Sequence, residues 1–211
     1  EKTTTKNLVS LIEKLNKDNK THGILVQLPL PPKIETPLVI RAVDPKKDVD
    51  GFNAYNLGKM FLSKEFEKLA PCTPSGIIKL LEHYKISVAG KNVTIVGRSN
   101  IVGKPLAVML INRDATVTVC HSKTRNLTDY TKRADILVAA VGRPNFIKAA
   151  MVKTGAIVID VGVNKVDGKL VGDVDFKAVA KKASFISPVP GGIGPMTVAC
   201  LMENVIKTFN I

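Results

Sequence analysis

The chain has 211 residues, of which 45% are hydrophobic, and its 31 lysines and arginines against 18 acidic residues give a net charge of +13. This length is enough for one large or two small domains, and no apolar run approaches the roughly 20 residues of a membrane helix. The positive charge indicates anionic partners. Because aromatic residues make up only 5% and tryptophan is absent, nucleic acid is not expected, and a phosphorylated cofactor or a polycarboxylate fits better.

The cysteines indicate a reducing compartment. Cys72, Cys120 and Cys200 are odd in number, far apart and set in apolar surroundings. This pattern favours free thiols and a cytoplasmic location over a disulfide framework. Their spacing is not that of metal ligands, and we predict no metal site.

The first part of the chain predicts two helices and one strand. Apolar residues recur at helical spacing over residues 7–15, and a second helix is expected over 36–43. The apolar segment 23–28 predicts a buried strand that ends at the following prolines. Gln27 lies at its end, and a buried amide there needs hydrogen-bond partners, from a neighbouring loop or from a ligand.

Two carboxylates follow in Lys47-Asp48-Val49-Asp50-Gly51. In extended backbone the side chains of Asp48 and Asp50 point the same way. The further acidic ligands of an EF-hand are absent after Gly51, which argues against calcium. Two interpretations remain: a turn in which aspartate accepts local hydrogen bonds, and a carboxylate that recognises donor groups of a ligand.

The rest of the chain alternates strands with helices. The loop Pro71–Gly76, with Thr73 or Ser75 as a helix cap, is the expected domain boundary before a helix over 77–84. This alternation predicts an α/β fold with a doubly wound parallel sheet and ligands outside the carboxyl ends of its strands. The expected strands are 93–96, 116–120, 136–140, 157–161 and 185–187.

A glycine-containing turn follows the first of these strands. Gly97 and Gly103 allow a tight turn, and Pro105 suits the first turn of a helix. Backbone N–H groups and the positive helix end would then face an anion. The glycine spacing departs from G-x-G-x-x-G, so an ordinary turn is the alternative.

The second strand of the sheet predicts the type of cofactor. An NAD-binding unit usually keeps an acid at its end, and the segment His121–Arg125 has none. Arg98, Ser122, Lys123 and Arg125 instead supply donors that suit a 2′-phosphate, which favours NADP.

Three further loops are candidates for contacts with ligands. Gly142 and Gly162 follow the third and fourth strands, and either allows close approach of a cofactor or only a turn. The segment 188–197 has three glycines and three prolines, so we expect a rigid loop before a helix over 198–207. Such a loop can present N–H groups to a ligand or simply start a helix.

These motifs, taken in order, resemble those of the bifunctional methylenetetrahydrofolate dehydrogenase/cyclohydrolase family, and the resemblance covers essentially the whole chain. The motifs that carry it are Val26-Gln27-Leu28-Pro29-Leu30-Pro31, Lys47-Asp48-Val49-Asp50-Gly51, Pro71-Cys72-Thr73-Pro74, Gly97-Arg98-Ser99 with Val102-Gly103-Lys104-Pro105, His121-Ser122-Lys123-Thr124 and Pro188-Val189-Pro190-Gly191-Gly192-Ile193-Gly194-Pro195-Met196-Thr197.

The resemblance implies two domains with a folate cleft between them. Residues 1–72, completed by 193–211, would form the catalytic domain, and 73–192 a Rossmann-type NADP-binding domain. Gln27 would lie beside the reacting carbon and hold the family's catalytic lysine. Asp50 would bind the amino-substituted edge of the pterin.

The resemblance also implies roles for the loop residues. Those expected on the folate side are Gly191, Gly192 and Thr197. Those expected at the cofactor are Arg98, Ser99 and Ser122 on the adenosine phosphate, Gly97 and Val163 through their backbone, and Thr73 where the cofactor meets the folate.

The implied activity is NADP-dependent oxidation of 5,10-methylenetetrahydrofolate, followed by hydrolysis to 10-formyltetrahydrofolate, in the one-carbon metabolism that serves purine biosynthesis. Folate polyglutamates suit the positive charge. A homodimer is expected, and neither nucleic acid nor membrane is an expected partner.

One expected part of the family pattern is a catalytic Tyr-x-x-x-Lys segment upstream of Glu1. None of Tyr55, Tyr84 and Tyr130 is expected to supply it. We therefore expect an N-terminally truncated chain that binds NADP and has little cyclohydrolase activity. The alternatives are an NADP-binding fragment without catalysis and another NADP-dependent reductase of the shikimate or amino-acid dehydrogenase type.

Overall fold

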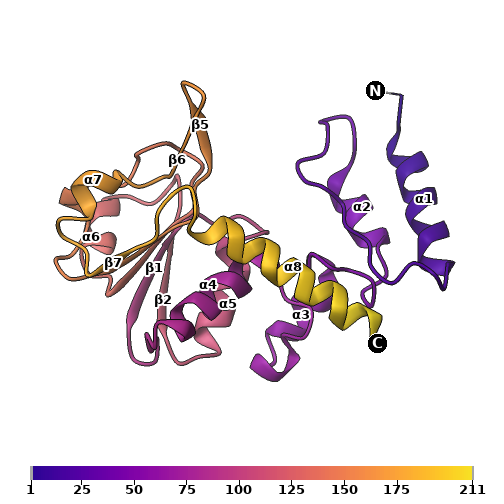
Figure 1. Ribbon diagram of the computed structural model, residues 1–211, viewed down its shortest axis with the longest axis horizontal. Coiled ribbons are helices and arrows are strands. Elements are labelled where there is room, and N and C mark those ends of the chain that lie inside the picture. The colour runs from indigo at the N-terminus through magenta and orange to yellow at the C-terminus, as the bar shows by residue number, and fades with distance from the viewer. Residues whose placement is uncertain (1, 211) are drawn as a thin grey trace. The chain divides into compact units, whose positions relative to one another are not determined.

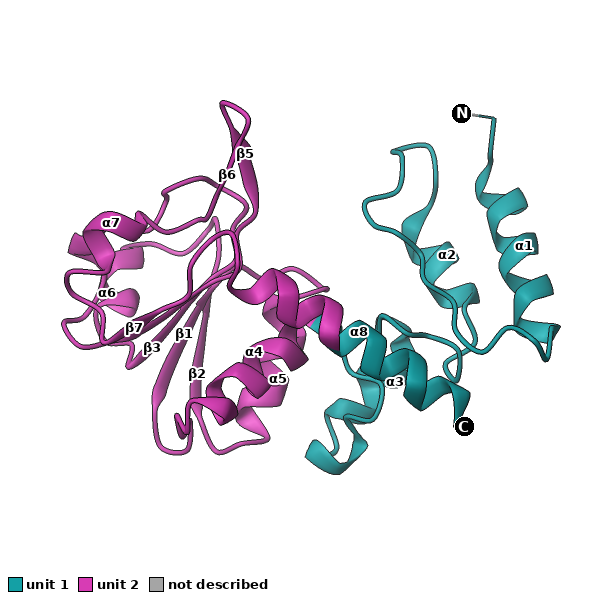
Figure 2. Cartoon of the chain, in the orientation of Figure 1, with its two compact units in different colours: residues 1–72, 200–211 teal, residues 73–199 magenta. Residues whose placement is uncertain are grey.

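The computed structural model describes residues 2–210. The chain divides into two compact units, 1–72 with 200–211 and 73–199 (Figure 2). Each unit contains its own cluster of buried apolar side chains.

The first unit is mainly helical. Thr4 caps its first helix, because the Thr4 hydroxyl oxygen accepts the Asn7 N–H at 3.2 Å. The two helices expected over 7–15 and 36–43 are confirmed, with small changes at their ends. The helical elements are α1 (Thr5–Lys17), α2 (Thr36–Ala42), α3 (Ala54–Met60), the 3-10 helix η1 (Lys64–Phe66) and the C-terminal part of α8 (Ile193–Phe209).

Buried apolar residues hold α1 and α2 together around Ile12, Ile24 and Val39. Lys47 adds a polar tie, since its ammonium group donates to the carbonyls of Leu15, Asn16 and Asp18 at 2.7–3.0 Å. The carbonyls of Leu15 and Asn16 lie in the last turn of α1, where the regular hydrogen bonds of the helix end. The lysine that opens the Asp48–Asp50 segment therefore fixes that segment to α1.

The expected strand over 23–28 is wrong. The structure has only a single parallel bridge between Ile24 and Asp48, with the Ile24 N–H 2.7 Å from the Lys47 carbonyl. Within the described residues this segment has no neighbouring strand with which to form a ladder, and Pro29 cannot donate a hydrogen bond. Gln27 accordingly lies on exposed, irregular backbone.

The second unit is built on a parallel sheet in the order β2-β1-β3-β4-β7. Every expected strand of this sheet is found within one residue at each end. Figure 1 shows α4 and α5 on one side of the sheet and α6 and α7 on the other. The elements are α4 (Cys72–His83), β1 (Asn92–Val96), α5 (Gly103–Ile111), β2 (Thr116–Cys120), α6 (Leu127–Thr131), β3 (Ile136–Ala139), the 3-10 helix η2 (Ala149–Met151), β4 (Ile157–Asp160), α7 (Phe176–Val179) and β7 (Phe185–Ile186).

The sheet is a doubly wound α/β arrangement. Its strand order runs outward from β1 in one direction to β2 and in the other to β3, which makes the β1/β3 pair the topological switch point. Register aligns the last residues of four strands, since Val96 pairs with Cys120 and Ala139, and Ala139 pairs with Asp160. The loops that follow these residues therefore meet at one edge of the sheet.

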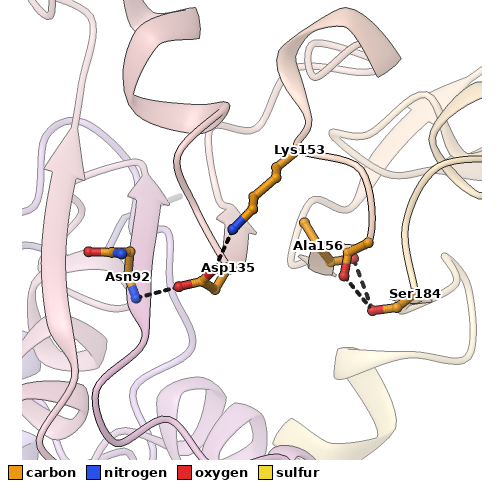
Figure 3. Close-up of polar contacts among 6 residues, drawn as sticks. Asn92, Asp135, Lys153, Ala156 and Ser184 are labelled. Atoms are coloured by element: carbon orange, nitrogen blue, oxygen red, sulfur yellow. Dashed lines mark hydrogen bonds and ion pairs between the residues drawn. The ribbon is translucent and has the colours of Figure 1, made fainter.

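The opposite edge is held by polar contacts (Figure 3). The Asp135 carboxylate accepts the Asn92 N–H at 2.9 Å and pairs with the Lys153 ammonium group at 2.6 Å. The Ser184 hydroxyl donates to the Gly155 carbonyl at 2.8 Å. These contacts join the segments that lead into β1, β3, β4 and β7.

Two boundaries differ from the expectations, and two elements were not predicted. Helix α4 begins at Cys72, so Thr73 and Ser75 lie inside its first turn and do not cap it. Helix α8 begins at Ile193 and includes Pro195, although an irregular loop was expected up to Thr197. Proline is compatible with a first helical turn, where no intrahelical N–H partner is lost. An antiparallel hairpin of β5 (Asn164–Val166) and β6 (Lys169–Val171) and helix α3 were not predicted.

No helix within residues 2–210 is both long and apolar enough to cross a membrane.

Candidate functional site

A pocket of about 390 Å³ opens at the carboxyl ends of β1, β2 and β3, at the switch point of the sheet. This is where open α/β sheets bind their ligands. It brings together four of the residues expected to bind the cofactor, Gly97, Arg98, Ser99 and Ser122. The remaining lining residues are Val96, His121, Leu127, Ala140, Val141, Arg143 and Phe146.

Gly97 and Gly103 fold the turn after β1 tightly. Gly97 has φ +132°, and a Cβ atom there would lie 2.1 Å from the Ala140 carbonyl oxygen. A Cβ atom on Gly103 would lie 2.1 Å from the Gly97 carbonyl oxygen. Neither position has room for a side chain, so the glycines allow the turn to pass close to β3 and to the start of α5.

Ser99 uses its acceptor atoms within the turn. Its hydroxyl oxygen accepts the N–H groups of Val102 and Gly103 at 3.1 and 3.3 Å, and its carbonyl accepts the Lys104 N–H at 3.0 Å. The expectation that freed N–H groups at the start of α5 face an anion is therefore wrong for these three residues. The hydroxyl hydrogen of Ser99 and the exposed guanidinium group of Arg98 are the donors that can serve a phosphate here.

The loop after β2 places Ser122 at the same pocket. His121 shapes this loop: its N–H donates to the Thr124 hydroxyl at 2.9 Å, and its Nδ1 accepts the Lys123 N–H at 3.2 Å. Lys123 and Arg125, which the sequence suggests as further cationic donors, are exposed and do not line the pocket.

The pocket also has an apolar and cationic wall, which was not predicted from the sequence. Leu127, Val141 and Phe146 supply apolar surface, and the Arg143 guanidinium carbon lies 5.8 Å from the centre of the Phe146 ring. Arg143 directly follows the glycine at the end of the third strand, and this position is the signal that could have identified it.

Gly162 and Val163 follow β4. A Cβ atom on Gly162 would lie 2.2 Å from Asp173 Oδ1, so the close approach at this glycine is to Asp173 and not to a cofactor. Val163 is 65% exposed and is not part of the pocket lining. Gly142 has φ +65° and open space at the Cβ position, so glycine is favoured there by the backbone conformation of the turn and not by a close contact.

Thr73 and Thr197 meet in the second unit. Their hydroxyl oxygens are 3.0 Å apart, and Thr197 also donates to the Ile193 carbonyl at 3.1 Å. Gly191 has φ +96°, and a Cβ atom on Gly192 would lie 2.3 Å from the Pro188 carbonyl oxygen. Both glycines therefore permit the turn that leads into α8, and neither they nor the two threonines line the pocket at β1–β3.

The two carboxylates of the first unit have different surroundings. Asp48 is buried and accepts three hydrogen bonds, from the N–H groups of Gly51 and Asn53 and from the Asn56 amide, at 2.8–3.1 Å. Burial, with a smaller contribution from Asp48, raises the pKa of Asp50 to about 6. Asp48 therefore agrees with the interpretation of a turn aspartate that accepts local hydrogen bonds. Asp50 agrees with the interpretation of a carboxylate that recognises donor groups of a ligand.

Two other side chains of this unit were singled out by the sequence. The Gln27 amide is exposed and donates to the Leu28 carbonyl at 3.3 Å, so solvent can satisfy it and no burial cost arises. Burial raises the pKa of the Cys72 thiol to about 12. Cys72 is therefore unsuited to act as a nucleophile.

One Tyr-x-x-x-Lys spacing does occur in the chain, contrary to the expectation that none of its tyrosines supplies it. Tyr55 and Lys59 lie one turn apart on α3, and the Lys59 ammonium nitrogen is 5.3 Å from the centre of the Tyr55 ring and 6.0 Å from that of Phe66. Because Tyr55 is 61% exposed, this arrangement is that of a surface cation–π contact.

Comparison with known proteins identifies the family of the chain. Residues 71–211 match the model of the tetrahydrofolate dehydrogenase/cyclohydrolase NAD(P)-binding domain, and residues 1–50 match that of the catalytic domain. The chain is 58% identical to the bifunctional protein FolD of Campylobacter concisus over 207 residues, which cover 98% of this chain and 72% of that protein. It is 56% identical to that of Bacillus subtilis, covering 95% and 71%.

Solved structures are similar throughout the chain. The bifunctional enzyme FolD from Campylobacter jejuni has a TM-score of 0.93 at 50% identity, covering 99% of this chain and 74% of that one. The FolD of Trypanosoma brucei, solved with NADP and an inhibitor, has a TM-score of 0.93 at 39% identity, covering 99% and 73%. With both domain models matched and relatives above 50% identity, the chain belongs to the tetrahydrofolate dehydrogenase/cyclohydrolase (FolD) family.

Proposed function

We propose that this chain performs the two reactions of its family, NADP-dependent oxidation of 5,10-methylenetetrahydrofolate and hydrolysis of the resulting methenyl compound to 10-formyltetrahydrofolate. The observation that carries this proposal is the pocket at the switch point, which gathers Arg98, Ser99 and Ser122 beside a glycine turn. Family membership argues against the alternative of a shikimate-type or amino-acid dehydrogenase.

The residues of the pocket fit an adenosine phosphate. Arg98 and Ser122 come from the ends of β1 and β2, where a 2′-phosphate would be held, and the segment that follows β2 has no acid to oppose it. Leu127 and Phe146 provide an apolar wall suited to a base. NADP⁺, when bound, supplies the hydride acceptor.

On the folate side we propose Gln27 and Asp50 as the catalytic and substrate-binding residues of the first unit. The half-buried carboxylate of Asp50 can accept hydrogen bonds from the amino-substituted edge of a pterin, which orients the substrate. Gln27 can hold a neighbouring lysine or the reacting centre through its exposed amide. Gly191, Gly192 and Thr197 are proposed to bind the substrate, and Val163 and Thr73 the cofactor.

The proposal extends to domains, assembly and location. We assign residues 1–72 with 193–211 to the folate domain and 73–192 to the NADP domain. The net charge of +13 supports folate polyglutamates as substrates. A homodimer is supported by the exposed apolar residues of the hairpin, including Val166 and Leu170. The three free cysteines support a cytoplasmic location.

Separate titrations of the purified 211-residue chain with NADPH, NADH and a folate analogue test the proposal. Binding of NADPH in preference to NADH, together with folate binding that Asp50→Ala weakens, is the expected result. Indifference to both NADPH and the folate analogue would refute it.

A matched variant resolves the role of Tyr55 and Lys59. If Lys59→Met abolishes hydrolysis of the methenyl compound by the chain, the pair on α3 takes part in that reaction. If Lys59→Met leaves the activity unchanged, the pair is a surface contact, as its exposure indicates.

A further inference from the structure

The loop after β3 contains three consecutive backbone N–H groups that converge on one carboxylate. The Val141 and Gly142 N–H groups donate to Asp173 Oδ2 at 2.6 and 2.9 Å, and the Arg143 N–H donates to Oδ1 at 2.8 Å. The Asn164 amide supplies a fourth hydrogen bond at 2.9 Å. Successive N–H groups that point to one centre form an anion-binding nest. Here the chain's own Asp173, which is fully buried, occupies the nest.

Asp173 is itself fixed by a second buried carboxylate. Asp160, at the end of β4, accepts the N–H groups of Gly162, Asp173 and Val174 at 2.9–3.0 Å. A Cβ atom on Gly172 would lie 1.8 Å from Asp160 Oδ2, so this packing requires glycine. The carboxylate in the nest therefore has little freedom to move.

The loop that Asp173 holds is a wall of the candidate cofactor pocket. Val141 and Arg143 both line that pocket, and Asn164, which also donates to Asp173, begins the hairpin after β4. We propose that Asp173 is a positioning residue for the dinucleotide: it shapes the pocket wall before the cofactor arrives, without touching the cofactor.

Two consequences follow from this arrangement. A wall that is already ordered reduces the conformational entropy lost on binding, which raises affinity. The filled nest also offers no backbone donors to the cofactor's phosphates, which leaves the side chains of the turn after β1, Ser122 and Arg143 as donors in the pocket. The inference rests on the proposed NADP function of this pocket.

The test compares Asp173→Asn with Asp135→Asn in the 211-residue chain, using NADPH fluorescence. Both variants lose one negative charge and a carboxylate that accepts a backbone N–H, but Asp135 lies at the opposite edge of the same sheet (Figure 3). Asp173→Asn is expected to raise the NADPH dissociation constant about tenfold or more, because its new NH₂ group faces N–H donors. Asp135→Asn should leave that constant within about twofold of the wild-type value. Weaker contacts of residue 135 with Asn92 and Lys153 lower the stability of the sheet but do not change the shape of the pocket.

Equal dissociation constants for wild type and Asp173→Asn, or equal weakening by both variants, would overturn the proposal. Hydrogen exchange on the unaltered chain decides the matter even if Asp173→Asn does not fold. The amides of Val141, Gly142 and Arg143 should be protected without NADPH, and free exchange there would also overturn the proposal. Failure of the wild-type chain to bind NADPH would instead refute the function proposed for the pocket, and exchange would still test the positioning.

Discussion

Asp48 and Asp50 show how neighbouring carboxylates on one loop acquire different properties. Asp48 is buried but receives three hydrogen bonds, which offset the cost of burying its charge. Asp50 is half-buried, and its pKa is raised to about 6 by burial and by the charge of Asp48. A carboxyl group kept in this state carries an energetic cost at neutral pH that a ligand with hydrogen-bond donors can relieve.

The first prediction concerns that cost. Burial raises the pKa of Asp50 to about 6 in the folded chain, against an ordinary value of 3.8, so between these pH values the folded state binds the extra proton and stability falls as pH rises. Asp50→Asn removes this effect. The variant should be more stable than wild type by about 1–2 kcal/mol at pH 8, with the difference vanishing below about pH 4.

Urea unfolding of both proteins across this pH range measures the difference. Asp48→Asn is the contrasting variant, because it disturbs a satisfied acceptor and should destabilise the chain by about 1–3 kcal/mol. An Asp50→Asn chain that is less stable than wild type at pH 8 would show that the charged Asp50 carboxylate does not lower the free energy of unfolding.

Arg98 is the residue on which cofactor choice is predicted to depend. Arg98→Ala should weaken NADPH binding by about 10- to 100-fold, because a charged hydrogen bond to the 2′-phosphate is worth about 1.5–3 kcal/mol. NADH binding should change little. Lys104→Ala is the control: it removes the same charge from the adjoining helix start, where the ammonium group donates to the Asn100 side chain at 2.8 Å. Equal loss of NADPH and NADH affinity in Arg98→Ala would argue against a 2′-phosphate at this position.

At the scale of elements, the turn after β1 depends on a glycine for two separate reasons. Gly97 has φ +132° and no room for a Cβ atom, whereas Gly168, in the turn between β5 and β6, has φ +78° and open space. We predict that Gly97→Ala destabilises the chain by more than about 3 kcal/mol or prevents folding, and that Gly168→Ala costs only about 1–2 kcal/mol. Thermal unfolding gives both values. A similar loss of stability in the two variants would mean that the turn after β1 can shift to make room for the added methyl group.

The central strands β1, β3 and β4 of the parallel sheet were predictable from sequence because they are mostly buried and form short apolar runs. Val93–Val96 and Ile136–Ala139 are examples, and all eight residues are buried. The same signal misled at residues 23–28, where an apolar run lacks a partner strand. The hairpin around Asp167-Gly168 was not predicted, because its strands are short and exposed and carry no apolar pattern. The Asp-Gly pair, a recognised turn signal, could have indicated it.

The candidate site was predictable only in part. Arg98, Ser99 and Ser122 come together because the ends of neighbouring parallel strands meet at one edge of the sheet, and that can be inferred from strand order. Asp173 could not be identified in this way. Most of its partners are backbone N–H groups of the segment 141–143, and backbone donors leave no mark on the residue types.

At the scale of the whole molecule, a net charge of +13 should make the binding of anionic substrates depend on salt. We predict that a folate pentaglutamate binds more tightly than the monoglutamate at about 50 mM salt, and that this advantage largely disappears at about 0.5 M salt, where charges are screened over about 4 Å. Parallel titrations of both ligands measure the ratio, with the monoglutamate as the control. A ratio that is independent of salt would mean that the extra glutamates make no electrostatic contact with the chain.

Helix α8 contributes residues to both compact units, and each unit depends on the register of its own part of the helix. Thr197 meets Thr73 in one unit, while the Asn204 amide donates to the Val49 and Ala70 carbonyls at 2.9 and 3.1 Å in the other. Deleting one residue between Cys200 and Asn204, which are both buried in the first unit, would turn one of them by about 100° around the helix axis relative to the other. Either the packing of Cys200 or the hydrogen bonds of Asn204 would then be lost, so insertions and deletions in this stretch should be far less tolerated than substitutions.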